Sequence, residues 1–104
     1  MAKAQSSQVV DPNTNAVPIF ELGTNQVITT SGTSAATASS IGKDIVRIVA
    51  SEDSYIEFGV SPTATTSSYL VLGGIVEYFK TDPSFKVAAI QKDAAGEVHV
   101  STCL

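Results

Sequence analysis

The stretch that most constrains the fold of this 104-residue chain runs from Ser54 to Gln91. Within it, short runs of β-branched and aromatic residues alternate with polar ones, and chain breakers interrupt them about every 8–12 residues. These breakers are Gly59 with Pro62, the pair Gly73-Gly74 and the pair Asp82-Pro83. A two-residue period with breakers at this spacing is typical of a β-sandwich or a small barrel.

Alternation predicts further strands on both sides of this stretch. With those inside it, the predicted strands cover residues 17–22, 26–31, 44–51, 55–58, 69–72, 75–80, 85–90 and 97–101, and 33–40 is an edge strand or a loop. A 3.6-residue period is sustained nowhere, so no helix is expected. We therefore predict an all-β fold, a small β-sandwich or jelly roll of about eight strands with an extended N-terminal arm.

Turn chemistry predicts where the chain reverses. Gly23-Thr24-Asn25 is expected to be a turn, Gly73-Gly74 a two-residue hairpin turn, and Gln91 to Gly96 a hairpin loop. Asp82 to Phe85 lacks a glycine, which favours a type I over a type II turn. Alternation also predicts a core that includes Ile56, Phe58, Leu70, Leu72, Val87, Ile90, Val98 and Val100.

The composition limits the possible functions. Charged residues make up 15% of the chain, against about 25% in an average soluble protein, so large surfaces are uncharged. Such surfaces suit permanent packing against other subunits, although serine and threonine that decorate outward strand faces explain them equally well. The net charge of −4 and the absence of a basic run argue against direct binding of nucleic acid.

The sequence shows no pattern of a secreted or membrane-spanning protein. The first ten residues lack the apolar segment of a signal peptide, and no stretch has the roughly 18 apolar residues of a membrane span. The single cysteine, Cys103, cannot form a disulfide within the chain. We therefore expect a protein that folds in a reducing cytoplasm and does not contact a membrane.

No residue set for catalysis stands out. His99 is the only histidine, and alternation places it on the polar side of a terminal strand, whereas a general base requires a shaped pocket. Cys103 lies near the end of the chain without a positioned base. Zinc requires three or four cysteine or histidine ligands, and no Asp-rich calcium loop is present. We therefore predict no enzymatic activity, no catalytic residues, no metal site and no cofactor.

A resemblance to a known group of proteins adds what the residues alone do not show. Phe58-Gly59, Pro62 to Thr66, Gly73-Gly74, Tyr78-Phe79 and Lys86-Val87-Ala88 follow one another at spacings that resemble small bacteriophage virion proteins of the capsid decoration, or cement, type. The resemblance lies in the C-terminal half of the chain. It implies a structural role in a phage particle, on the surface of a capsid assembled in the cytoplasm of the bacterial host.

The chain is predicted to have two parts. Residues 1–16 are polar and turn-rich, and form an extended arm that either stays disordered or becomes ordered on a neighbouring subunit; residues 17–104 form a single β-sandwich or jelly-roll domain. The predicted contacts to other subunits or to the capsid are Val9, Val10, Val17, Ile19 and Arg47. Arg47 stands out because it is a lone charge among apolar neighbours, typical of an edge strand or of an interface anchor.

Several functions fit these observations. The first is a non-enzymatic decoration protein that binds the outer surface of an assembled phage head and stabilises it, with the major capsid protein and copies of itself as partners. The resemblance implies a homotrimer first and a dimer second. Another virion component, such as a head fibre base or a tail or adaptor protein, is the alternative, and a small glycan-binding module is a further one.

Overall fold

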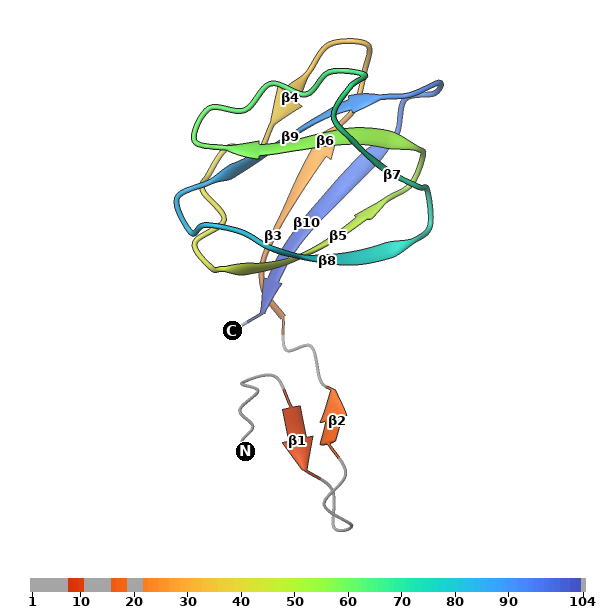
Figure 1. The fold of residues 1–104 in the computed structure, drawn as a ribbon. Helices are drawn as coiled ribbons and strands as arrows, with labels where there is room; N and C mark the ends of the chain where they lie inside the picture. Colours follow the sequence, from red (N-terminus) through yellow and green to blue (C-terminus); the bar gives the residue numbers. More distant parts are fainter. Residues whose placement is uncertain (1–7, 11–15, 19–21, 104) are drawn as a thin grey trace.

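The protein consists of two four-stranded antiparallel sheets and a separate pair of short strands. The computed structural model describes residues 8–10, 16–18 and 22–103. Its strands are β1 (Gln8–Val10), β2 (Ala16–Pro18), β3 (Leu22–Thr29), β4 (Ala35–Ala36), β5 (Ile45–Ala50), β6 (Ser54–Gly59), β7 (Tyr69–Val71), β8 (Val76–Lys80), β9 (Lys86–Gln91) and β10 (Glu97–Cys103). The predicted all-β fold is confirmed (Figure 1).

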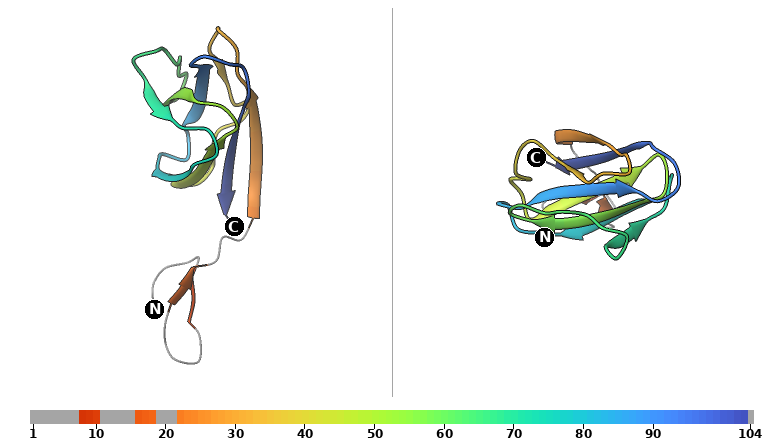
Figure 2. Two further views of the ribbon diagram at one scale, coloured as in Figure 1. Left: turned by 90° about the vertical axis from the view of Figure 1, so that its right-hand side faces the viewer. Right: turned by 90° about the horizontal axis from the view of Figure 1, so that it is seen from above.

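The two sheets have the strand order β3-β10-β5-β8 and β4-β9-β6-β7. Pairing proceeds from the two ends of the jelly roll toward its middle. β3 pairs with β10, β4 with β9, β5 with β8 and β6 with β7. Residues 22–103 therefore form one long two-stranded ribbon, closed at β6 and β7 and wound into two layers (Figure 2). Eight strands wound in this way form a jelly roll.

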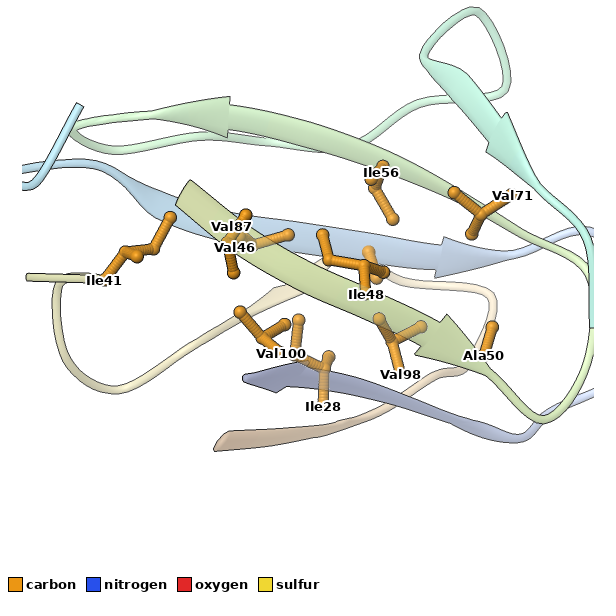
Figure 3. Packing of buried hydrophobic residues seen from close by; sticks show 11 residues of the cluster. Ile28, Ile41, Val46, Ile48, Ala50, Ile56, Val71, Val87, Val98 and Val100 are labelled. Atoms are coloured by element: carbon orange, nitrogen blue, oxygen red, sulfur yellow. The ribbon is translucent and has the colours of Figure 1, made fainter. Parts of the chain in front are cut away.

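The core lies between the two layers (Figure 3). Alternate residues of each central strand face inward, as Val46, Ile48 and Ala50 do in β5, and are essentially inaccessible to water. The remaining buried members of the cluster are Ile28, Ile41, Ile56, Val71, Val87, Ala89, Val98 and Val100. Ile56, Val87, Val98 and Val100 of the predicted core are confirmed. Phe58 is half-buried and packs at the margin of the cluster, and Ile90 is half-buried but lies outside it.

The prediction that Leu70 and Leu72 belong to the core is wrong. Val71 between them is buried, with 1% of its surface exposed, whereas Leu70 and Leu72 are 36% and 48% exposed. All four residues from Tyr69 to Leu72 are apolar, so alternation gave no preference for either face. Pairing with β6 decides between them, because Val71 lies opposite the inward-facing Ser54.

The predicted hairpin at Gly73-Gly74 is also wrong, because the chain crosses there from one sheet to the other. Gly74 has a φ of 80°, in the left-handed region that favours glycine. A Cβ on Gly73 would lie 2.9 Å from the carbonyl oxygen of Ser51. Both glycines serve a tight crossing between β7 and β8. The connection at 91–96, predicted as a hairpin loop, likewise joins two sheets.

The predicted turn at Gly23-Thr24-Asn25 is replaced by continuous strand, since all three residues lie in β3. The register between β3 and β10 shifts here at a β-bulge, and a Cβ on Gly23 would lie 2.9 Å from the Thr102 hydroxyl oxygen. The glycine therefore permits a close approach of two strands and not a turn. By contrast, the turn at Asp82 to Phe85 is confirmed by a 2.9 Å hydrogen bond from the Phe85 N–H to the Asp82 carbonyl.

The predicted first strand at 17–22 is not among the eight strands of the jelly roll. Val17 and Pro18 belong to β2, which pairs with β1, and residues 19–21 lie outside the described residues. The edge strand or loop predicted at 33–40 contains the two-residue edge strand β4, which takes that place. β2 spans the predicted boundary between arm and domain at residues 16 and 17, and this boundary stays a prediction.

Candidate interaction surface

The outward side of the sheet β3-β10-β5-β8 carries a row of partly apolar side chains. The register places Val27, His99, Val49 and Val76 side by side across all four strands. Val27 and Val76, at the two ends, are 47% and 41% exposed. Side chains opposite one another on one face of a sheet are in contact range, so these residues form a continuous strip.

A second row runs parallel to the first and contains Asn25, Ser101, Arg47 and Tyr78. Ser101 donates a 2.6 Å hydrogen bond to the Asn25 side chain. Arg47 and Tyr78 are register partners, and each makes an interaction within the chain. Together with Ile45 and Lys80, the next register pair, the two rows make up what we call the open face: Val27, His99, Val49, Val76, Asn25, Ser101, Arg47, Tyr78, Ile45 and Lys80.

The opposite sheet does not present its outward side in the same way. The connection between β6 and β7 runs back past β4 (Figure 1), and the N–H of Ala64 in this connection donates to the Ser34 hydroxyl at 2.9 Å. Ala64 is buried, and so is Ala88 of β9, although alternation turns Ala88 outward. Part of the outward side of the β4-β9-β6-β7 sheet is therefore covered by the chain itself.

The side of the sandwich at β7 and β8 is closed by aromatic side chains. The Phe79 ring lies 5.5 Å from that of Phe58 and 5.6 Å from that of Tyr69, measured between centroids. The Tyr69 hydroxyl donates a 2.9 Å hydrogen bond to the Glu77 carboxylate. This hydrogen bond and the negative charge of Glu77 raise the pKa of Tyr69 above its ordinary value. These contacts connect the edges of the two sheets.

Of the five predicted contact residues, the structure places one on the open face. Arg47 lies in its second row and is half-buried. Val9 and Val10 lie in β1 and Val17 in β2, where the backbone alone is described, and Ile19 is outside the described residues. These four stay predictions.

Sequence reasoning missed most of the open face, including Val27, Ile45, Val76 and Tyr78. One signal was present: residues 45–50 are apolar on both sides of the strand except at Arg47. In an antiparallel sheet with one solvated side, the outward residues are usually polar. Apolar residues on both sides therefore distinguish this strand from one whose outward side is simply solvated.

The remaining polar groups in the described part of the chain do not gather into a metal-binding set. His99 lies 3.2 Å from the Glu97 carboxylate in an exposed pair on the same strand. Across the described ranges, no group of three or more histidine, cysteine, aspartate or glutamate side chains could hold a metal ion. The same residues include no helix long and apolar enough to cross a membrane.

Comparison with known proteins yields no relative. No family model matches the chain, and searches of curated proteins and of solved structures find no match either.

Proposed function

We propose that the protein is a non-enzymatic capsid decoration protein of a bacteriophage. It binds the outer surface of the assembled head through its open face, and its partners are the major capsid protein and copies of itself. The observation that carries the proposal is the open face: a sheet surface of the jelly roll on which Val27, Val76 and Tyr78 are exposed. The resemblance of the C-terminal half to small virion proteins supplies the viral context, and the jelly roll is a frequent fold of capsid proteins.

The proposed mechanism is stabilisation by mass action. A protein that binds the assembled shell, and not the free capsid subunits, shifts the equilibrium toward the shell. Each contact can be weak, because a shell presents many equivalent sites and a decoration protein with several contacts binds them together. A surface on which most side chains are uncharged suits this role, since its contact buries few charges.

The proposal predicts that the protein protects packaged DNA. Heads of the phage that encodes the chain are prepared with and without the protein, and DNA release is followed against temperature in dilute buffer, where cations screen the packaged DNA least. Heads that lack the protein should release DNA at a lower temperature. Identical release curves, with the absence of the protein verified, would refute cementing and favour a fibre or tail component.

A pair of charge substitutions tests the open face itself. Val27→Lys introduces a charge on the open face, whereas Leu70→Lys introduces the same charge at a 36% exposed position of the other sheet. Copies bound per head are counted by gel densitometry after sedimentation of the particles. Val27→Lys should reduce the copy number and Leu70→Lys should not. The reverse result would move the contact to the other sheet.

The N-terminal arm is expected to add to this attachment. Deletion of residues 1–16 should leave the jelly roll folded, because both four-stranded sheets lie within residues 22–103. The same deletion should weaken binding to heads. Equal binding of the truncated and the full chain would show that the arm makes no contact with the shell.

A further inference from the structure

The four edge strands of the two sheets differ in how well they are protected against pairing with another chain. An exposed edge offers backbone N–H and C=O groups, and natural proteins shorten or cover it. β4 has two residues and β7 has three. Beside β3, the Gln26 side-chain amide accepts from the Ser39 N–H at 3.0 Å and donates to the Ser39 carbonyl at 3.1 Å, which holds the 37–44 segment in place.

Within the described residues, β8 is neither shortened nor covered in this way. It has five residues without a proline, and among the strands that the structure describes its sole neighbour is β5. It is flanked by residues that are exposed and apolar, Leu72 and Ile75 before it and Val76 at its start. A strand of this length and composition at a sheet edge is a template for pairing.

The hydrogen-bond phase of β8 shows which of its residues face the free side. The Thr81 N–H donates to the Asp44 carbonyl at 2.8 Å, which continues the ladder between β5 and β8. Antiparallel ladders use alternate residues, so Glu77 and Phe79 bond to β5. The N–H and C=O groups of Val76, Tyr78 and Lys80 point away from β5.

We propose that β8 pairs antiparallel with β8 of a second copy of this chain, about a two-fold axis at Tyr78. In this register Tyr78 lies opposite its counterpart, and Val76 lies opposite Lys80 of the second copy. The backbone N–H and C=O groups of these three residues point away from β5. They can therefore form the hydrogen bonds between the two copies. The two sheets then form one continuous eight-stranded sheet, and the two open faces lie side by side. This pairing does not depend on the proposed role in a phage particle.

Glu77 selects this register among the alternatives. A two-fold axis perpendicular to the sheet keeps each residue on the same side of the sheet in both copies. The axis therefore passes at a residue, and the alternative registers place it at Glu77, at Tyr78 or at Phe79. An axis at Glu77 would place two carboxylates directly opposite each other, which is unfavourable. An axis at Phe79 would leave Val76 without a strand residue opposite it. With the axis at Tyr78 all five residues pair, and Glu77 lies opposite Phe79.

Sedimentation velocity of the purified full chain tests the pairing. A five-residue edge contact is smaller than a standard interface, so we expect a dissociation constant of about 10–100 µM and a dimer that appears between about 1 and 500 µM protein. Val76→Pro removes an N–H that points to the free side and should raise the constant at least tenfold while the ladder to β5 is kept.

Val27→Pro is the matched control. Val27 is also an exposed valine in an edge strand of the same sheet. The Thr30 N–H donates to the Gly96 carbonyl of the ladder to β10, which directs the Val27 N–H to the free side of β3. The control should dimerise like the wild type. A control that dissociates while Val76→Pro dimerises would assign the contact to β3 and overturn the proposal.

A charge-swap experiment tests the axis and does not depend on proline. Because Tyr78 faces its counterpart, Tyr78→Lys and Tyr78→Glu should each sediment as monomers, and an equimolar mixture of the two should regain the dimer. A mixture that stays monomeric, while the wild type dimerises, would refute the register. A wild-type chain that is monomeric at every concentration, or trimeric, would refute the pairing, since edge pairing about a two-fold axis closes at two copies.

Discussion

Truncation of Val71 and of Leu72 to alanine measures directly which side of β7 faces the core. Val71 is 1% exposed and belongs to the buried cluster, whereas Leu72 is 48% exposed. Val71→Ala removes two carbon atoms, which is a loss of about 1.6 kcal/mol of burial at about 0.8 kcal/mol for each. The cavity left between the sheets adds to this, so we expect a total loss of about 2–3 kcal/mol.

Leu72→Ala removes three carbon atoms, but nearly half of the residue is already in water, so the same rate gives a smaller loss of about 1 kcal/mol. Urea unfolding followed by circular dichroism, at one protein concentration for all variants, gives both values from the transition midpoints at unchanged slope. In thermal unfolding the Val71 variant should melt about 8–24 °C lower than the wild type. A larger effect of Leu72→Ala than of Val71→Ala would show that β7 faces the opposite way.

Three further predictions concern the connections between the sheets. Gly73→Ala should destabilise the protein by more than about 1 kcal/mol because its Cβ would meet backbone, while Gly32→Ala, with nothing within 4 Å, should be neutral or stabilising in urea unfolding. Thr30→Val should lower the free energy of unfolding by about 1–3 kcal/mol in the same measurement. It removes a hydroxyl that donates to the Gly96 carbonyl and accepts from the Gly96 N–H. The Ser84 hydroxyl and N–H donate to the Asp82 carboxylate and lower the pKa of Asp82. This carboxylate therefore stabilises the fold above the pKa that it has in the unfolded chain, and the stabilisation is lost as the pH falls through its lower pKa in the folded protein. Asp82→Asn should therefore reduce the acid dependence of stability below about pH 4, and an NMR titration of Ser84→Ala should show a raised pKa of Asp82.

The strand positions were predictable because they rest on local chemistry. The β-branched run at 45–50 and the alternation of valine with polar residues at 97–101 specify extended strands wherever their neighbours lie. The turn at Asp82 to Phe85 also depends on four consecutive residues alone. Each of these features is fixed within a window of a few residues, which is the range over which the sequence pattern carries information.

The sheet to which a strand belongs was not predictable in the same way. Gly73-Gly74 allows a hairpin and a crossing between sheets equally, and the choice depends on β5 and β6, which lie about 20 residues away. The open face was missed for a related reason. Its rows join residues from four strands, such as Val27, Val49 and Val76, and no local pattern brings them together.

The place of β10 in its sheet has a consequence for how the molecule acquires its structure. Among the strands that the structure describes, β10 comes last in the sequence, yet it lies between β3 and β5. Until residues 97–103 have left the ribosome, these two strands have no partner between them, and the sheet cannot close around its core. The pairing of β3 with β10 also joins the most distant parts of the jelly roll, which slows folding. A stalled or nicked chain that lacks β10 would expose two additional bare strand edges, and we expect such chains to aggregate rather than to persist as partly folded monomers.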